Sequence, residues 1–441
     1  MPKRKATFRL YPNATEKAAL EETLSLHCRV YNALLEEHRR RYEAGETTFS
    51  FQAMCKALTL WRECAKSLAT LNAQGLQVTA KRAALAFEAF FRRVKKGETP
   101  GYPRFKSWKR FSGFGFKTHG DGWKLMQAHC ALKRGGRCAG YEYGAVRLSG
   151  IGTVSMRGRA GFDGVPKTAE VMRRGDKWYL SVTFDVTENE IRRQGGRVST
   201  AFDWGVTTLL TQVTGDALTG EIEKVENPRW LKKQLGKIVE LQQGTSRLET
   251  AAKLASGKDR GFPVNARLER LYRRLRAVHG KIARQRHDFY HKLTAAMVAR
   301  FGLIVTEELS VANMSRAPKP KKNEDGTYAP NGAAAKAGLN RSIQDAAPAG
   351  LIAKLRYKAA DAGSKFNPIP TRKVKPSQRC CLCGATEKHE LSVRRWTCKC
   401  GAEHDRDENA ARTMLRYAYE GDWWNRKDGA GTVPAAAARA A

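Results

Sequence analysis

The chain has 441 residues, more than one ordinary hydrophobic core contains, so two to four domains are expected. Lysine and arginine number 80 against 43 acidic residues, a formal charge of +37, and such an excess requires an anionic partner. A hydrophobic content of 41% excludes a disordered basic tail, and no run approaches the roughly 18 apolar residues of a membrane span. No lipidation motif or apolar signal core is present, so we expect a cytoplasmic, nucleoid-associated protein that binds nucleic acid and not membrane.

The first hundred residues change from a strand pattern to a helical one. Residues 1–10 alternate apolar and polar side chains, as a strand does. Residues 11–102 then contain three amphipathic stretches, which end near Gly45, Leu68 and Lys95. This part of the sequence therefore predicts a strand followed by a small helical bundle.

Residues 103–187 are rich in glycine and in short alternating runs, which predict a small barrel or an open sheet. In the segment GYPRFKSWKRF, aromatic residues interleave with cations, so bases could stack on the rings while Arg104 and Lys106 meet phosphate. An ordinary aromatic-rich β segment would explain any single ring equally well.

The segment from residue 196 to residue 370 mixes strands with long basic helices. Asp203 lies in a predicted strand, and Gly205 allows a tight turn beside it. Residues 227–301 are helical and strongly basic. A solvated face is the usual explanation of such charge, but its density favours phosphate contact by residues such as Arg284 and Arg286. A short buried strand then ends at Glu307, next to Glu308.

Five of the ten cysteines lie between residues 380 and 400. Cys380-x-x-Cys383 and Cys398-x-Cys400, separated by an insert of hairpin length, predict a zinc ribbon over residues 371–401. Four thiolates complete a tetrahedral shell, so the zinc ion would be structural. Cys381 is a spare that could compete with Cys380, and His389 and His404 are possible substitutes. A redox pair is disfavoured because no βαβ pattern surrounds the motif.

Three acidic positions stand out in a chain dominated by cations: Asp203, Glu307 and Asp407. A buried strand end is a poor place for a carboxylate unless it meets a metal ion or a cation. Together the three could hold two Mg²⁺ ions about 3.5–4 Å apart and cut a phosphodiester. Each signal alone is weak, since Asp405 or Asp407 could merely cap a helix.

The order of these motifs resembles the TnpB family of transposon-encoded RNA-guided nucleases, which are relatives of the compact type V CRISPR effectors. TAFDWGVTTLLT is similar to the first RuvC motif, LIVTEELSVANM to the second and HDRDENAARTML to the third. The matching carboxylates are Asp203, Glu307 rather than Glu308, and Asp407. Three features depart from the family: the shortened Cys-x-Cys turn, a possible insertion at 118–140, and the alanine-rich end of the chain.

The resemblance implies a multidomain α+β architecture. An RNase H-like RuvC nuclease domain would comprise residues 196–370 and 402–420, with the zinc ribbon inserted at 371–401. Residues 1–10 and 103–187 would form a wedge-like β-barrel, residues 11–102 an inserted helical recognition domain, and residues 421–441 a disordered tail.

The activity implied is that of an RNA-guided DNA endonuclease. The protein would bind a guide RNA and a short motif beside the target in double-stranded DNA, open the duplex, and cut single strands at one site with two Mg²⁺ ions. Gln74 and Gln77 become candidate readers of that motif, because an amide can pair with adenine; a solvated helix face is the alternative. A compact type V CRISPR effector, a guided repressor without cleavage, and an unguided zinc-dependent DNA-binding protein are the alternatives. The oligomeric state stays open.

Overall fold

A computed structural model of the chain describes residues 3–46, 49–132, 138–187, 195–390 and 392–425. The chain divides into two compact units, Met1–Ile191 and Arg192–Ala441. Part of the possible insertion at 118–140, and most of the predicted tail at 421–441, lie outside the described residues. None of the helices in the described ranges combines the length and the apolar character that crossing a membrane requires.

The helices of the first unit lie where the periodicity predicts them. α1 begins at a capping box, in which Asn13 and Glu16 each accept a hydrogen bond from the other's backbone N–H group. From this cap the helix continues without interruption for 30 residues. The helical segments are α1 (Ala14–Glu43), α2 (Phe51–Cys64), α3 (Lys66–Ala69), α4 (Ala73–Lys95) and the 3₁₀ turn η1 (Trp108–Arg110).

The sheet of the first unit has the strand order β2-β7-β8-β1-β5-β4-β3, with β6 paired to β4. The N-terminal strand therefore lies in the middle, antiparallel to both β8 and β5. Among the described strands no pairing joins β2 to β3, so the hydrogen-bonded path is open. The strands are β1 (Lys3–Tyr11), β2 (Gly113–Phe116), β3 (Trp123–Leu132), β4 (Cys138–Leu148), β5 (Gly152–Arg157), β6 (Arg159–Ala160), β7 (Val165–Arg174) and β8 (Lys177–Asp185).

Helices and sheet of the first unit share one apolar core. Phe8, Leu180 and Phe184 from the strands belong to the same buried cluster as Leu24 and Leu34 from α1. Because this cluster is continuous, the helical segment and the strands that flank it in sequence are one packed body.

The second unit is built on a five-stranded sheet with the order β11-β10-β9-β12-β15. The central β9 is parallel to β12, which is parallel to β15, whereas β10 and β11 are antiparallel additions. Parallel strands are usually covered on both faces, and the apolar run of β12 agrees with that. The strands are β9 (Val198–Trp204), β10 (Thr208–Thr214), β11 (Glu221–Glu226), β12 (Phe301–Glu307) and β15 (Lys365–Ile369).

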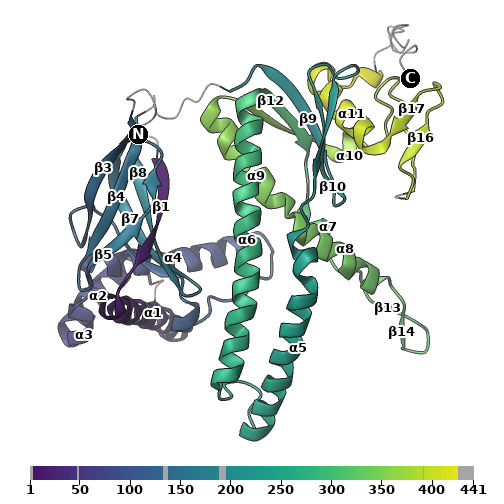
Figure 1. The fold of residues 1–441 in the computed structure, drawn as a ribbon. Coiled ribbons are helices and arrows are strands. Elements are labelled where there is room, and N and C mark those ends of the chain that lie inside the picture. The colour runs from purple at the N-terminus through teal and green to yellow at the C-terminus, as the bar shows by residue number, and fades with distance from the viewer. Residues whose placement is uncertain (1–2, 47–48, 133–137, 188–194, 391, 426–441) are drawn as a thin grey trace. The chain divides into compact units, whose positions relative to one another are not determined.

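Helices cover both faces of this sheet (Figure 1). Phe202 and Ile304 point to one face and pack with residues of α6, α8 and α9. Ala201 and Val305, one position earlier and later, point to the opposite face and pack with α11. The helices are α5 (Trp230–Ser256), α6 (Ala266–Arg300), α8 (Ala333–Ala346), α9 (Pro348–Ala362) and α11 (Arg406–Glu420). The alternation of side chains along β9 and β12 thus decides which residues face α11.

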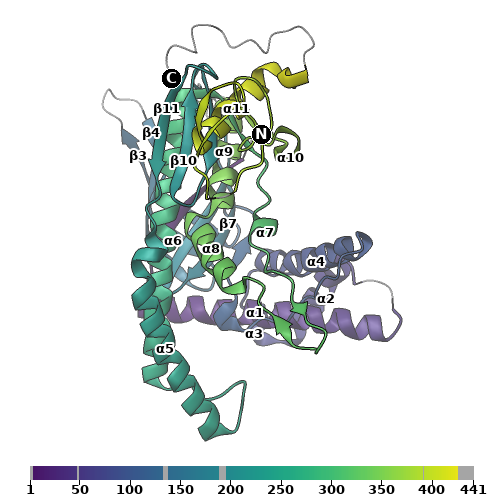
Figure 2. The ribbon, with the colours of Figure 1, turned by 90° about the vertical axis from the view of Figure 1, so that its right-hand side faces the viewer.

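α5 and α6 form a long antiparallel hairpin that extends away from the sheet, as both views show (Figures 1 and 2).

The remaining elements of the second unit are short. The short elements are α7 (Val311–Met314), β13 (Lys321–Lys322), β14 (Tyr328–Ala329), α10 (Thr371–Val374), β16 (Arg395–Thr397), β17 (Glu403–Asp405) and the 3₁₀ turn η3 (Trp423–Asn425).

Asp345 ties three helices of this unit together. α5 has no side-chain cap of its own, and the buried Asp345 on α8 instead accepts hydrogen bonds from the backbone N–H groups of Leu231 at 2.9 Å and Lys232 at 3.0 Å. Arg286 on α6 forms an ion pair with the same carboxylate at 3.4 Å. Arg286, considered above as a phosphate ligand, thus has an internal partner that favours a structural role.

Candidate functional site

Asp203 and Glu307 lie on neighbouring parallel strands at the same level. Phe202 of β9 is in register with Thr306 of β12, and the two acidic residues follow one position later on each strand. They share the alternation of Ala201 and Val305, so they point to the face that α11 covers. Two carboxylates far apart in the sequence are thereby held side by side.

Asp407 reaches the same place from the start of α11. Asp405 is the N-cap residue: its carboxylate accepts hydrogen bonds from the N–H groups of Asp407 and Glu408, both at 3.1 Å. Of the two aspartates that could have capped the helix, Asp405 therefore does so, and the carboxylate of Asp407 is left in the first turn. Asp407 Oδ1 lies 3.5 Å from Arg394 Nη1, and Lys224 pairs with Glu408 at 2.7 Å.

The pKa shifts of two of these carboxyl groups have burial as their largest cause, and that of Asp203 also reflects the other two acids. Burial raises the pKa of Asp203 well above its ordinary value, and the nearby charges of Glu307 and Asp407 raise it further. Burial also raises the pKa of Glu307, against a hydrogen bond from Thr371 that lowers it. Glu308, in contrast, is exposed. Of the neighbouring pair, it is Glu307 that faces the other acids.

A hollow of about 320 Å³ adjoins this acidic cluster, and we call it the carboxylate hollow. Its lining includes the turn from Trp204 to Thr208, Arg394 and Asp407. Gly205 is required in this turn because a Cβ atom there would lie 2.5 Å from the backbone oxygen of Thr208. The tight turn predicted beside Asp203 is therefore present, and it forms one wall of the hollow.

The donor set of this cluster suits a hard divalent cation. Carboxylate oxygens are the preferred ligands of Mg²⁺, which keeps several waters and needs few protein groups. Three neighbouring, partly buried carboxylates repel one another, and a divalent cation would relieve that repulsion more fully than the largely exposed Arg394 does. The residue types present therefore suit such ions, but among the described residues only the four cysteines form a group of three or more ligand side chains whose ligand atoms all lie within 4.8 Å of one another.

The four predicted zinc ligands form a second cluster, compatible with a zinc site. One sulfur atom each from Cys380, Cys383, Cys398 and Cys400 lies within 4.8 Å of all the others. The Sγ atoms of Cys380 and Cys400 are 3.8 Å apart, and those of Cys383 and Cys398 are 3.5 Å apart. Zinc–sulfur bonds of about 2.3 Å in a tetrahedron separate sulfurs by about 3.8 Å. The shortened Cys-x-Cys turn thus still brings both of its thiols to the cluster.

The three alternative ligands lie beside the cluster rather than in it. Cys381 is buried, its N–H donates to Asn409 Oδ1 at 2.9 Å, and burial raises the pKa of its thiol to about 12. His389 and His404 both pack against the Trp396 ring, each with ring centroids 4.6 Å apart. His404 Nε2 also lies 3.1 Å from Cys380 Sγ, so His404 contacts a ligand atom while the four thiols complete the shell.

The cysteine segment is bonded directly to the helix that carries Asp407. Asn409 donates to the backbone oxygens of Pro376 and Arg379, and Arg416 donates to those of Cys381 and Leu382. The strand β17 of the ribbon then continues without a break into the cap of α11. The ribbon and the acidic cluster are therefore one rigid arrangement.

The candidate base readers in the first unit already have partners. Gln74 Oε1 accepts from the N–H of Thr118 at 3.0 Å, and its amide nitrogen donates to Asp121. Gln77 Oε1 accepts from Lys117 Nζ at 2.6 Å. A base could use either amide only by displacing these contacts, so their role as readers stays a prediction.

The candidate phosphate ligands differ in their surroundings. Arg104 is exposed and, with Lys106, lines a hollow between α1, α4 and the loop that follows α4. Lys106 Nζ lies 4.7 Å from the centroid of the Tyr31 ring. Arg284 is exposed on α6, whereas Arg286 pairs with Asp345. No local pattern in the sequence singles out Arg394 or Lys224, because their partners, Asp407 and Glu408, belong to another segment.

Three family models match the chain. A helix-turn-helix domain model of the OrfB/IS605 type matches residues 1–47, a "Probable transposase" model of that type matches 182–317, and a Cas12f1-like TNB domain model matches 349–414. Residues 3–11 are a strand and residues 14–43 one helix, so the first description does not fit the described fold of that segment.

Curated relatives span nearly the whole chain. Two of them carry the name "Putative RNA-guided DNA endonuclease". The one from Streptomyces pristinaespiralis is 28% identical and covers 94% of this chain and 89% of its own length. The other, InsQ of Escherichia coli strain K12, is 27% identical and covers 92% and 90%.

A solved structure shares the fold. The protein chain in a cryo-EM structure of a Cas12f1–sgRNA–target DNA complex aligns with a TM-score of 0.52 at 12% identity, over 94% of this chain and 98% of that one. The fold is thus that of the compact Cas12-type proteins. Beyond the fold, the chain is similar to IS605-type transposase models and to curated relatives named RNA-guided DNA endonuclease, over the residues and at the identities given above.

Zinc content tests the four-cysteine cluster. We expect about one zinc per chain in the purified protein, and near-complete loss of zinc in Cys398→Ser, because three thiolates leave the shell open. Elemental analysis of the gel-filtered protein measures this. Cys381→Ser and Cys64→Ser, an exposed position in the first unit, should keep the metal. If Cys381→Ser lost zinc while Cys398→Ser kept it, the ligand assignment would be wrong.

The pH dependence of stability tests the acidic cluster. A carboxyl group with a raised pKa stabilises the fold while protonated, and that contribution disappears as pH rises through its folded pKa. Without divalent ions, Asp203→Asn should therefore melt about 2–4 °C above the unchanged protein at pH 7.5, with a smaller gap at mildly acidic pH. Added Mg²⁺ should narrow the gap at pH 7.5. Asp259→Asn, in an exposed loop, is the matched control. An equal rise in its melting temperature would show that the effect of Asp203→Asn does not come from the acidic cluster.

Proposed function

We propose that this protein is an RNA-guided DNA endonuclease that cuts with a single divalent-metal site formed by Asp203, Glu307 and Asp407. Both curated relatives described above are named for that activity. The observation that supports the proposal is the placement of the three carboxylates: strand register holds Asp203 beside Glu307, and Asp407 stands in the first turn of α11, which packs on that face of the sheet.

We further propose that the second unit contains a RuvC nuclease domain of the RNase H-like type, formed by residues 196–370 and 402–420. The central parallel strands with two antiparallel additions, order β11-β10-β9-β12-β15, support it. The ribbon at 371–401 would carry a structural zinc ion, inserted between the sheet and α11. In the first unit, residues 1–10 and 103–187 would be the wedge-like domain and 11–102 the recognition domain.

Two Mg²⁺ ions bound at the carboxylates would supply an activated water and neutralise charge on the leaving oxygen of a phosphodiester. The chain's own residues prepare that site. Asp203 and Glu307 are fixed by strand register, and Asp407 by the capped start of α11. Arg394 balances Asp407 in the absence of ions, and its largely exposed side chain can swing toward a bound phosphate.

The partners proposed are a guide RNA and DNA, double-stranded before opening and single-stranded when cut. A formal charge of +37 suits holding two polyanions together, and predicts binding that weakens strongly with salt. Base pairing would carry the sequence specificity while the protein grips backbone and reads a short duplex element. Acting on genomic DNA, such a protein would be associated with the nucleoid.

A compact type V CRISPR effector is the second candidate, favoured by the match to a Cas12f1-like TNB domain model. A guided repressor without cleavage is disfavoured, because retention of all three clustered carboxylates has no use in binding alone. The transposon-encoded endonuclease and the CRISPR effector would differ in their genomic setting but use the same chemistry at the same residues.

A matched pair of neighbouring glutamates tests the proposal. Glu307→Ala should lower Mg²⁺-dependent cleavage of a guided duplex target by about three orders of magnitude or more, because it removes a metal ligand. Glu308→Ala removes the same charge from an exposed position and should cut normally. Gel analysis of cleavage and a mobility-shift assay of target binding measure the two effects. Both variants should bind target equally; normal cutting by Glu307→Ala would reject the site.

A further inference from the structure

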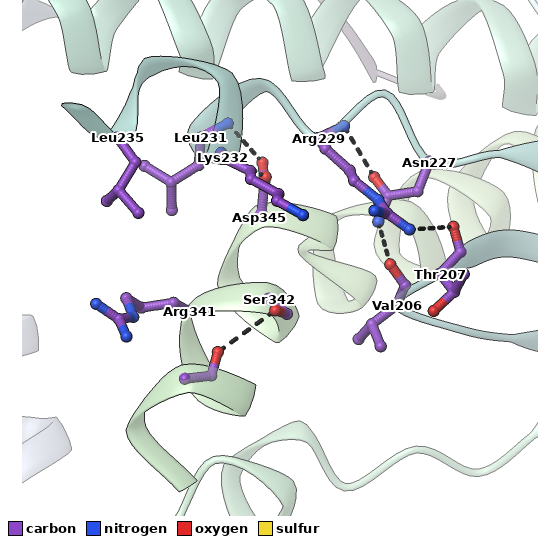
Figure 3. A pocket seen from close by; sticks show the side chains of 11 residues that line it. Val206, Thr207, Asn227, Arg229, Leu231, Lys232, Leu235, Arg341, Ser342 and Asp345 are labelled. Atoms are coloured by element: carbon purple, nitrogen blue, oxygen red, sulfur yellow. Dashed lines mark hydrogen bonds between the residues drawn. The ribbon is translucent and has the colours of Figure 1, made fainter. Parts of the chain in front are cut away.

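A second hollow lies next to the carboxylate hollow, between the start of α5 and α8. Its volume is about 320 Å³. We call it the α5–α8 hollow; its lining residues include Val206, Leu231 and Leu235, which are apolar, and Arg229, Lys232 and Arg341, which are cationic. Figure 3 shows the two leucines of α5 facing Arg341 and Ser342 of α8 across the open space. The hollow therefore combines an apolar wall with a positive rim.

The one acidic group in its lining is already neutralised. Asp345 is buried, accepts two backbone hydrogen bonds from the start of α5, and pairs with Arg286. Within the described part of the chain, no carboxylate forms an ion pair with Lys232 or Arg341. The rim thus offers uncompensated positive charge to an anion.

The rim is also held in a fixed shape. Arg229 has φ 50°, a left-handed conformation that is rare for a residue with a side chain and often found at functional sites. Its N–H donates to Asn227 Oδ1 at 3.1 Å, its guanidinium Nη2 donates to the backbone oxygen of Thr207 at 3.4 Å, and Asn227 Nδ2 donates to that of Val206 at 2.8 Å. The turn after β9 is thereby locked to the start of α5.

The two hollows share a wall. Val206 and Thr207 line both, and on α8 the neighbours Gly338 and Leu339 line one each. Of the three carboxylates, Asp407 alone lines the carboxylate hollow. A flexible chain with a phosphate at the carboxylates could therefore continue past the Val206–Thr207 turn into the α5–α8 hollow.

We propose that the α5–α8 hollow binds one nucleotide of the DNA strand being cut, beside the scissile phosphate. The base would lie against Val206, Leu231 and Leu235, and a phosphate would meet Lys232 and Arg341, with Arg229 behind them. Apolar contact with a base face and cations on the backbone are the usual means of holding single strands. This inference rests on the proposed nuclease function. Its consequence is that the hollow fixes the register of the strand and so the position of the cut.

The test uses the full-length protein as purified with its bound RNA. Lys232→Ala/Arg341→Ala removes two exposed rim charges, and Leu235→Trp fills the hollow without changing charge. Lys233→Ala/Lys237→Ala is the matched control, since it removes two exposed charges from α5 at positions outside the lining. A melting curve for each protein shows that it is folded.

Two readouts are measured. The first is the affinity of each variant, in an Asp203→Ala background that cannot cut, for a fluorescent five-nucleotide oligothymidylate. We expect the dissociation constant to rise about tenfold for both hollow variants and less than twofold for the control. The second is the cut position on a guided target, mapped at single-nucleotide resolution with Asp203 intact. The hollow variants should cut more slowly and at scattered positions.

The outcomes separate this inference from the proposed function. Hollow variants that bind the oligonucleotide and cut as the unchanged protein does would overturn the inference alone. Loss of copurified RNA in the hollow variants, but not in the control, would assign the hollow to RNA and also overturn it. An unchanged protein that cuts no DNA, but whose oligonucleotide binding depends on the hollow, would reject the nuclease proposal and support the hollow.

Discussion

Repulsion among three neighbouring, partly buried carboxylates is the constraint on which the second unit depends. Asp203 and Glu307 are forced together by the register of two parallel strands, and Asp407 is added from the first turn of α11. The raised pKa of Asp203 reports the energetic penalty of this arrangement. A fold keeps such a penalty only where a bound cation relieves it. The apolar contacts of Ala201 and Val305 with α11, one step away from the acids, hold the three segments against their own repulsion.

The cysteine cluster explains how the third carboxylate can be placed so firmly. α11 is short, and its start would fray without support. The Asp405 cap, the buried Asn409 and the bonds of Arg416 to the turn after Cys380 fix this helix to the ribbon at both ends. Closing the ribbon around a metal ion therefore also fixes the angle at which Asp407 enters the site. The four-cysteine cluster lies beside a carboxylate pair because one positions the other; that coupling is structural and involves no shared ligand.

Local patterns in the sequence were sufficient for the elements and for the residues at their ends. Strand-end acids, cysteine spacing and helical periodicity predicted Asp203, Glu307, the four thiols and the helices of the first unit, because each depends on neighbours in sequence. They could not decide between Asp405 and Asp407 as the cap, since both suit it. They also missed the Arg286–Asp345 pair and the partners of Gln74 and Gln77, which come from residues tens of positions away. The α5–α8 hollow, assembled from segments around residues 206, 231 and 341, has no signature in any one of them.

Anomalous diffraction from crystals soaked in Mn²⁺, an oxygen-seeking substitute for Mg²⁺, tests the central claim most directly. Two manganese peaks about 3.5–4 Å apart, each touching oxygens of Asp203, Glu307 or Asp407, are the predicted result. A zinc peak among Cys380, Cys383, Cys398 and Cys400, recorded at the zinc edge, would show that the crystal reports bound metal. Manganese absent from the three carboxylates in such a crystal, or bound only elsewhere, would contradict the account.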